Sequence, residues 1–257
     1  MRIATFNANS IRARLPIVLE WLGANAPDAL CIQETKATDA DFPAAAFADA
    51  GYQVVFRGEK TYNGVAIVSK EPLADVRFGL DDGEQAGETR LACARLGSVH
   101  IVNTYVPQGR ELDHPMYAYK LRWLARLKDY FARHYTPRQK VVWVGDMNVA
   151  PEAIDIHNAA EQANHVCFHV DVRAAFADAV GWGFVDVFRK YHPEPGQYTF
   201  FDFRTVNAVK RNMGWRVDHV LATPPLAAKS TDCRIDLKPR LGERPSDHTF
   251  LVADFDA

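Results

Sequence analysis

Acidic and amide side chains interrupt the apolar runs of this chain at several points. The residues in these positions are Asn7, Glu34, Asp146, Asn148, Asp218, Asp247 and the adjoining His248. Hydrolysis of a phosphodiester by water requires a cation to neutralise the phosphoryl oxygens, a group that activates and aims the water, and donors for the developing negative charge. This set of side chains can supply all three, and it is therefore compatible with metal-assisted phosphodiester hydrolysis.

Two carboxylates in this set are candidates for a cation site. Glu34 and Asp247, with Asn7, offer the hard oxygen ligands that Mg²⁺ prefers. Mg²⁺ takes few protein carboxylates and keeps several waters, so a small set is sufficient. Asp146 can polarise the attacking water, and Asn148 can orient it.

The histidine of the set can act on the phosphate itself. His248 can face the phosphate as a charged donor, with Asp218 holding its other ring nitrogen and raising its pKa. These positions also have ordinary structural explanations, because an aspartate after a strand is commonly a turn or N-cap residue and Asp-x-Asn alone is a weak signal. We interpret His192 and His219 as surface or packing residues.

A second group of possible metal ligands comprises His157, His165, Cys167 and His169. On a strand, residues 165, 167 and 169 would share one face. Neither an acid-rich pattern nor a CxxC pair reinforces such a site. We therefore favour a loop stabilised by local hydrogen bonds over a second metal cluster.

Strand-like apolar runs recur along the chain and must bring the polar residues together. They cover Arg2 to Phe6, Ala29 to Gln33, Gly64 to Ser69, Leu91 to Leu96, Val99 to Tyr105, Val141 to Val144, Arg216 to Ala222 and Thr249 to Ala253. In layered sheets the strand ends and their loops converge on a common crevice, so residues from position 7 to position 248 can meet there.

Helical periodicity is clearest after Ser10 and after Asp113, which we expect to be N-caps. The first helix would bury Ile11, Leu15, Val18, Leu19 and Leu22. The second, with Pro115 in its first turn, would bury Tyr117, Leu121, Leu124, Leu127 and Phe131.

The opposite face of the second helix is basic, with Arg122, Arg126 and Arg133, and we favour simple solvation of this face over DNA contact. Shorter helices are expected over Asp171 to Val180 and Phe184 to Tyr191. This mixture of strands and helices predicts a layered α/β or α+β domain.

Composition places the chain among ordinary globular proteins. It has 257 residues, 48% of them hydrophobic and 24% charged, and we find no repeat or linker, so residues 1–257 are expected to form a single domain. No apolar stretch approaches the roughly 20 residues needed to span a bilayer, and no secretory signal is evident, so we expect no membrane association and a cytoplasmic location. The net charge of −2 gives no support to bulk electrostatic coating of nucleic acid.

The cysteines argue against a disulfide framework. Cys31, Cys93, Cys167 and Cys233 lie far apart, and the first two sit inside apolar runs. We expect reduced thiols, which are buried in the case of Cys31 and Cys93.

Nine segments, taken in order, give the chain a specific resemblance. They are FNANSIRAR (Phe6 to Arg14), DALCIQETK (Asp28 to Lys36), YNGVAIVSK (Tyr62 to Lys70), NTYVPQG (Asn103 to Gly109), VGDMNVAPEAIDI (Val144 to Ile156), FVDVFRKYHPE (Phe184 to Glu194), YTFFDFR (Tyr198 to Arg204), GWRVDHVLA (Gly214 to Ala222) and ERPSDHTF (Glu243 to Phe250). Together they resemble exonuclease III and the related abasic endonucleases of the endonuclease/exonuclease/phosphatase superfamily. The resemblance implies a four-layered sandwich in which two packed β-sheets are flanked by helices.

The resemblance also assigns site residues. The implied catalytic residues are Tyr105, Asp146, Asn148, Asp218 and His248, the implied metal residues are Asn7, Glu34 and Asp247, and Tyr105 is thereby added as a phosphate donor. Asn9 matches a position that supports the metal site, where some relatives have an aspartate, and we group it with the substrate side. The general base is left open by the family, and Asp146 is our choice.

The segments around Trp215 correspond to the pocket that receives a flipped-out abasic sugar. Phe200, Trp215 and Val217 would line it, and apolar walls sized for a deoxyribose would leave no room for a base. Trp215 stands where many bacterial members have an aliphatic residue, whereas YTFFDFR keeps the bacterial ending. This mixture leaves the balance of endonuclease and exonuclease activity open.

The activity implied is Mg²⁺-dependent hydrolysis of the DNA backbone 5′ to abasic sites, with trimming of 3′ ends, Mn²⁺ as a substitute metal, and a monomer acting on double-stranded DNA. A phosphoesterase for a phospholipid or inositol phosphate would share the metal site and the final Ser-Asp-His, but the pocket segment argues against it. A silent nucleic-acid-binding module would be expected to have lost metal or base residues, and none of these is missing.

Overall fold

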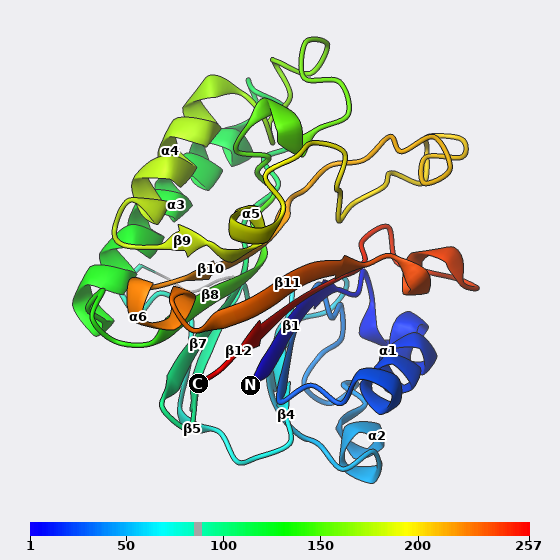
Figure 1. Ribbon diagram of the computed structural model, residues 1–257, viewed down its shortest axis with the longest axis vertical. Coiled ribbons are helices and arrows are strands. Elements are labelled where there is room, and N and C mark those ends of the chain that lie inside the picture. The colour runs from blue at the N-terminus through cyan, green and yellow to red at the C-terminus, as the bar shows by residue number, and fades with distance from the viewer. Residues whose placement is uncertain (85–88) are drawn as a thin grey trace.

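The computed structural model describes residues 1–84 and 89–257. Within these residues the chain forms two six-stranded sheets, with the strand orders β11-β12-β1-β2-β4-β3 and β5-β6-β7-β8-β10-β9 (Figure 1). The first sheet contains β1 (Arg2–Asn7), β2 (Ala29–Gln33), β3 (Gln53–Arg57), β4 (Val65–Ser69), β11 (Ser230–Asp236) and β12 (Phe250–Phe255). The second contains β5 (Ala74–Phe78), β6 (Leu91–Leu96), β7 (Val99–Tyr105), β8 (Val141–Asp146), β9 (Val185–Asp186) and β10 (Asp218–Ala222).

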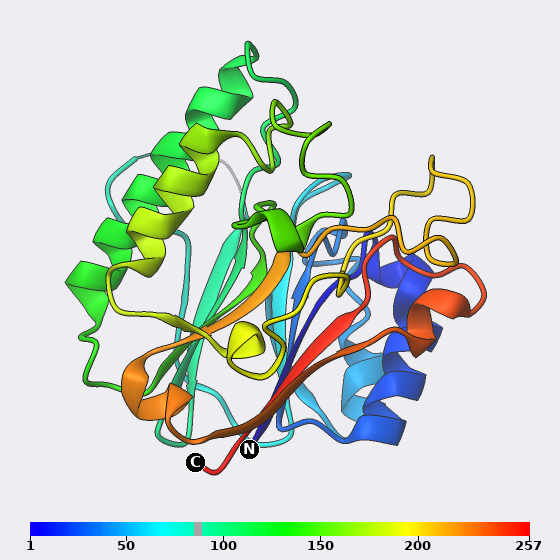
Figure 2. The ribbon, with the colours of Figure 1, turned by 45° about the horizontal axis from the view of Figure 1, so that its top comes forward.

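Helices cover the outer faces of both sheets, as Figure 2 shows. The α-helices are α1 (Ile11–Asn25), α2 (Ala44–Asp49), α3 (Pro115–His134), α4 (Val170–Val180), α5 (Val187–Tyr191) and α6 (Pro224–Ala227), and the 3₁₀-helices are η1 (Ala153–Asp155) and η2 (Lys238–Leu241). Helices α1 and α2 lie outside the first sheet, and α3 and α4 lie outside the second. The fold is therefore the expected four-layered sandwich.

Three apolar cores hold these layers together. Between the sheets, Ile3 and Cys31 pack in one cluster with Ile101 and Val144 of the facing sheet. Val18 and Leu22 of α1 pack on the first sheet, whereas the core outside the second sheet is built on aromatic side chains such as Trp143 of β8 and Phe131 of α3. Burial of this apolar surface is the main force that fixes the layers.

Each sheet contains one parallel pair of strands joined by a helix. Strands β1 and β2 are parallel, as are β7 and β8, with α1 and α3 as the connecting helices. The carboxyl ends of these four strands lie at one end of the sandwich, and they carry Asn7, Glu34, Tyr105 and Asp146. Two antiparallel neighbours, β10 and β12, begin at this end, so Asp218 and His248 arrive there from the opposite direction.

One glycine is needed for this close approach. Gly145 precedes Asp146 with φ 134°, and a Cβ atom at this position would lie 2.0 Å from the carbonyl oxygen of Thr104 on β7. Any larger residue would push β8 away from β7 at the point where the strand delivers Asp146.

All eight expected strands are present with small shifts at their ends, whereas two of the expected helix starts were wrong. Ser10 occupies the N-cap position of α1, as expected, but makes no side-chain capping bond. The second helix is capped by His114, whose side chain accepts a bond from the Met116 amide, and not by Asp113. The expected helix from Phe184 is interrupted, because the short strand β9 pairs with β10 before α5 begins.

The basic face of α3 is not uniformly solvated. The guanidinium of Arg126 forms an ion pair with Asp82, with Nε 2.6 Å from Oδ2, and Arg133 donates to the Leu80 carbonyl at 2.8 Å. Arg122 is exposed, as expected. The prediction of simple solvation is therefore wrong for Arg126, whose partner lies far away in the sequence.

The four cysteines are free, as the sequence predicted, and all are buried, whereas burial was predicted only for Cys31 and Cys93. In the described part of the chain, no helix combines the length and the apolar character that a membrane crossing requires.

Candidate active site

A cavity of about 800 Å³ opens at the end of the sandwich where the polar residues converge. Of the residues predicted from the sequence, those that line it are Glu34, Tyr105, Asp146, Asn148, Phe200, Trp215, Val217, Asp247 and His248. Asp218 and Asn7 are fully buried and contact the lining residues from behind. The structure thus brings together side chains that are separated by up to 241 positions, from Asn7 to His248.

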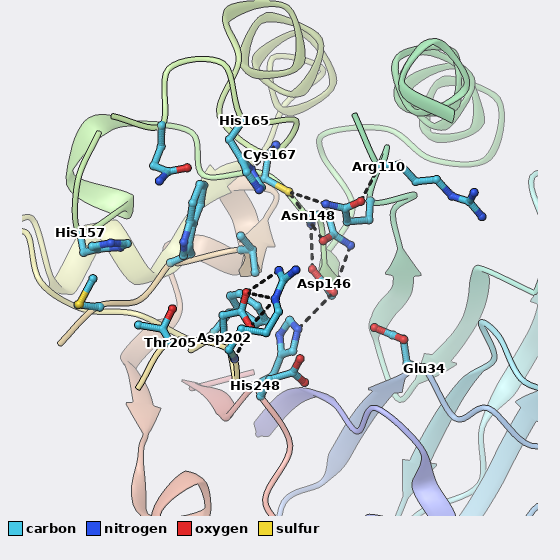
Figure 3. A pocket seen from close by; sticks show the side chains of 18 of the residues that line it. Glu34, Arg110, Asp146, Asn148, His157, His165, Cys167, Asp202, Thr205 and His248 are labelled. Atoms are coloured by element: carbon cyan, nitrogen blue, oxygen red, sulfur yellow. Dashed lines mark hydrogen bonds and ion pairs between the residues drawn. The ribbon is translucent and has the colours of Figure 1, made fainter. Parts of the chain in front are cut away.

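A chain of three side chains crosses the floor of the cavity. Nδ1 of His248 lies 2.8 Å from Oδ2 of Asp218, and its Nε2 lies 3.7 Å from Oδ2 of Asp146. Figure 3 shows His248 and Asp146 facing each other, with Glu34 to one side and His165 and Cys167 beyond Asn148. The arrangement follows from strand register, because Asp218 on β10 pairs directly with Asp146 on β8.

The protonation states of His248 and Asp146 depend on each other. Burial acts to lower the pKa of His248, but the carboxylates of Asp218 and Asp146 outweigh it and raise the pKa to about 10. Burial raises the pKa of Asp146 to about 7; the charge of His248 opposes this rise, and the carboxylates of Asp218 and Glu34 add to it. Near neutral pH the imidazole is therefore a cation, and Asp146 is able to exchange a proton.

Hydrogen bonds hold Asn148 against Asp146, and they depend on the backbone conformation of Asn148. Its φ of 49° lies in the left-handed region, which asparagine tolerates better than most residues. Its amide N–H donates to Oδ1 of Asp146 at 2.9 Å, and its Nδ2 donates to the Val106 carbonyl at 3.0 Å and to Oδ2 of Asp146 at 3.3 Å. Both oxygens of Asp146 are thereby oriented.

Glu34 also sits in the left-handed region, with φ 48°. One of its oxygens accepts a bond from Nδ2 of Asn7 at 2.8 Å, and the same Nδ2 lies 2.8 Å from Oδ2 of Asp146. The other oxygen lies 2.8 Å from Nζ of Lys36. Asn7 therefore presents its nitrogen, and not an oxygen ligand, to the two carboxylates.

Asn9 joins the metal-side residues and does not face the cavity. Its Nδ2 donates to Oδ1 of Asp247 at 3.0 Å, and its Oδ1 accepts from Lys36 at 2.6 Å. Ser246, which precedes Asp247, bonds to β1, because its hydroxyl donates to the Asn7 carbonyl at 2.8 Å. Glu34 and Asp247 are thus held at one edge of the cavity by a shared network.

The oxygen-rich donor set fits a hard divalent cation. Asp146, Asp218 and His248 place ligand atoms within 4.8 Å of one another, but an imidazolium repels a cation, so this trio is better suited to proton chemistry. Glu34 and Asp247 keep their carboxylates beside it, at the cavity surface. A buried oxygen of Asp218 also has no hydrogen-bond partner among the described atoms.

Aromatic residues form the opposite wall. Phe200 and Trp215 bond to each other through both backbone amides at 2.9 Å, which fixes the pair as a short bridge. The Phe200 ring lies 4.9 Å from the His248 ring, and the His165 ring lies 4.5 Å from Trp215. Val217, 4% exposed, completes an apolar surface beside the charged floor.

The four candidate ligands between positions 157 and 169 do not form a second cluster in the structure. The segment is a series of turns and not a strand. His157 contacts the Gly214 carbonyl through Nδ1, whereas His165 and His169 accept bonds from the amides of Cys167 and Asp171. The preferred interpretation, a loop with local hydrogen bonds, is confirmed.

Several residues of the site were not identified from the sequence. Lys36 ends one of the segments that carry the resemblance but was not predicted as a site residue, although its position two residues after Glu34 is a usable signal. Gln108, Arg110, Asp202 and Arg204 also line the cavity, as does His165, which was considered only as a ligand of a second metal cluster. They lie in irregular loops, where no periodicity marks the direction of a side chain.

Comparison with known proteins points in one direction. The pattern of the Endonuclease/Exonuclease/phosphatase family matches residues 4–248. Exodeoxyribonuclease III of Haemophilus influenzae is 30% identical over 99% of this chain and 100% of its own length. Among solved structures, an AP endonuclease from Archaeoglobus fulgidus is 53% identical with a TM-score of 0.98, and the 3′-5′ exonuclease NExo from Neisseria meningitidis is 38% identical with a TM-score of 0.95; both comparisons cover 100% of each chain.

Proposed function

This chain belongs to the Endonuclease/Exonuclease/phosphatase family, and on that premise we propose that it is a DNA-repair phosphodiesterase that hydrolyses the backbone 5′ to abasic sites and trims 3′ ends. The observation that carries this proposal is the Asp218–His248–Asp146 chain, which lies in one cavity with Glu34 and an aromatic wall. Relatives named AP endonuclease, exodeoxyribonuclease III and 3′-5′ exonuclease support the same chemistry.

Asp146 is the residue that activates water. Its raised pKa, about 7, makes its carboxylate a base matched to neutral pH. Asn148 and Asn7 hold it by hydrogen bonds, so the oxygen that takes the proton has a fixed direction. Proton transfer to Asp146 leaves a hydroxide-like nucleophile aimed at phosphorus.

His248 and Tyr105 donate to the phosphate. His248 stays protonated because its pKa is raised to about 10 by Asp218 and Asp146 against the effect of burial. Burial, with the charges of Glu34 and Asp146, raises the pKa of Tyr105 well above its usual value, so its hydroxyl keeps its proton. Donors fixed before the reaction stabilise the charge that develops on the phosphoryl oxygens.

Glu34 and Asp247 provide carboxylates for Mg²⁺, with Mn²⁺ as a substitute. When bound, the cation neutralises negative charge on the scissile phosphate. Asn7, Asn9 and Lys36 position these carboxylates through the contacts described above.

Selection of the damaged site depends on the aromatic wall. Phe200, Trp215 and Val217 form an apolar surface that suits the ring of a deoxyribose turned out of the duplex. An intact nucleotide would also have to place its base there, so the site is chosen by the absence of a base. A single chain supplies all of these residues, and we propose that the protein acts on double-stranded DNA as a monomer.

The direct test uses duplex DNA with one abasic analogue, incubated with and without Mg²⁺, with the product ends resolved. The expected result is Mg²⁺-dependent incision 5′ to the analogue, with slower removal of nucleotides from a recessed 3′ end. Cleavage of inositol phosphate or phospholipid substrates without DNA cleavage would contradict the proposal. DNA binding without cleavage at any Mg²⁺ concentration would identify a binding module instead.

A further inference from the structure

A lysine lies fully buried beneath the active-site loops. Lys120 belongs to α3 and is 0% exposed. Its ammonium donates to three backbone carbonyls, those of Asn148 at 2.7 Å, Val166 at 2.9 Å and Gln108 at 3.1 Å. The sulfur of Cys167 lies 3.9 Å away.

The three carbonyls come from three different segments that build the cavity. Gln108 follows β7, Asn148 follows β8, and Val166 precedes Cys167 in the turns before α4. Gln108, Asn148 and Cys167 all line the cavity. One ammonium group is therefore the common anchor of the loops that form this side of the site.

A charge in this position is unfavourable for packing alone. Burial lowers the pKa of Lys120, whereas Cys167 and Asp146 act in the opposite direction. An apolar side chain of similar length would fill the space without this cost, and buried ionic groups are poor evidence for stability. The three directed bonds indicate that the ammonium fixes backbone positions.

The bond to Asn148 is the one with a chemical consequence. Asn148 has φ 49°, a conformation that needs support from its surroundings. The Lys120 bond to its carbonyl provides that support, and the amide and Nδ2 of the same residue then reach the two oxygens of Asp146. We propose that Lys120 is a positioning residue, which sets the direction of Asp146 through Asn148 without touching the substrate.

This proposal rests on the proposed function, in which Asp146 activates water. The test is Lys120→Met, which keeps the length of the side chain and removes the charge and the donors. We expect kcat on an abasic duplex to fall about 10- to 100-fold, with KM changed less than about threefold, because a misaligned group is lost from the transition state and not from DNA binding.

The matched control is Lys190→Met. Lys190 also donates to a backbone carbonyl, that of Ala227 at 3.0 Å, but it lies on α5 away from the cavity. This variant should keep kcat within about twofold of the wild type. Lys120→Gln, which retains an amide donor, should lie between the wild type and Lys120→Met.

A double-mutant cycle with Asp146→Ala separates positioning from general damage. If Lys120 acts by setting the direction of Asp146, Lys120→Met should lower the residual kcat less than about threefold in the Asp146→Ala background. Equal losses in both backgrounds, or a Lys120→Met kcat within about twofold of wild type, would overturn the proposal. Unfolding of both Lys120 variants by circular dichroism, with Lys190→Met folded, would assign Lys120 to global stability and overturn it as well. An inactive wild type would instead contradict the proposed function.

Discussion

Nζ of Lys36 lies 2.8 Å from Oε2 of Glu34, so a carboxylate proposed for the cation site already has a counter-ion from its own chain. Nδ2 of Asn7 occupies the other oxygen of Glu34 at 2.8 Å. A cation that binds Glu34 must therefore compete with two protein donors. This competition makes the charge of Glu34, and not only its shape, decisive for metal binding.

Glu34→Gln should shift the Mg²⁺ dependence of cleavage. The amide keeps the shape of the side chain but loses the charge that attracts the cation, so the half-saturating Mg²⁺ concentration should rise about tenfold or more, with partial recovery of activity at high Mg²⁺. Cleavage rates over a Mg²⁺ titration provide the measurement. Glu20→Gln, an exposed position on α1, is the control for loss of one negative charge. An unchanged Mg²⁺ curve would remove Glu34 from the metal site.

Asp146→Asn and His248→Asn should each lower kcat on the order of 10²-fold or more, because both side chains act mainly on the transition state. DNA binding, measured by fluorescence anisotropy with the metal chelated, should stay within about threefold of the wild type. Turnover close to normal in either variant would be incompatible with the mechanism.

The raised pKa of His248 predicts that the stability of the metal-free protein depends on pH. His248 has its pKa raised from 6.5 to about 10, so its contribution to stability is fully present below pH 6.5 and is lost as the pH rises toward 10. Because Asp146 titrates with it, the comparison should be made between Asp146→Asn and Asp146→Asn/His248→Asn, by urea unfolding in EDTA from pH 6 to pH 10.

The difference in unfolding free energy between these two proteins should decrease with pH, by at most about 1.4 kcal/mol per pH unit. A difference that stays constant over this range would mean that the ring of His248 is neutral in the folded protein.

Trp215→Ala tests selectivity. Loss of a desolvated aromatic contact costs about 1–3 kcal/mol, hence roughly 5- to 150-fold in kcat/KM on an abasic duplex, whereas 3′-end trimming should fall less. The space that the indole ring leaves should also admit the base of an intact nucleotide more readily. The measurement is kcat/KM on three duplexes of one sequence, with an abasic analogue, an intact nucleotide or a recessed 3′ end.

Trp182→Ala is the aromatic control, since Trp182 packs against Phe131 and Phe184 away from the cavity. It should leave the ratio among the three substrates unchanged. Equal losses on all three substrates in folded Trp215→Ala would mean that Trp215 is core packing.

Asp155→Ala should be the most destabilising of these changes. Asp155 is 0% exposed and pairs with Arg189 and with Arg216, whose Nε lies 2.6 Å from its Oδ1. Removal of Asp155 leaves the buried guanidinium of Arg216 with one carboxylate partner in place of two, at a cost of about 3 kcal/mol in urea unfolding. Asp178→Ala breaks the exposed pair with Lys128 and should cost less than about 1 kcal/mol. Similar losses in the two variants would contradict this assignment.

The sequence predicts best where apolar periodicity is strong and where a motif is dense. The runs that became β2, β6 and β7 have the expected bounds, because most residues of each strand are buried. The edge strands β3, β5 and β11 were not predicted, since most of their residues are exposed or only partly buried. Similarly, His114 replaced Asp113 as a cap through a local bond that residue preference does not reveal.

At the site, residue types and order were sufficient to predict which side chains converge, but not how they contact one another. The nitrogen of Asn7 that lies between Glu34 and Asp146 depends on packing between β1 and β8 in different sheets. The role of Lys120 was not predicted, because it depends on backbone carbonyls that surround the ammonium only in the folded protein. Tertiary contacts of this kind leave no local signature in the sequence.

The pairing of β1 with β12 has a consequence for how the enzyme matures. Ile3 pairs with Ala253, a contact between opposite ends of the sequence, and Asp247 and His248 lie just before β12. Contacts this distant in the sequence form slowly, because a long stretch of chain must first be closed into a loop. Until β12 docks, no intermediate can hold Asp247 and His248 beside Glu34 and Asp146. Recovery of cleavage during refolding should therefore lag behind the recovery of helical signal, and activity becomes a reporter for the final closure of the first sheet.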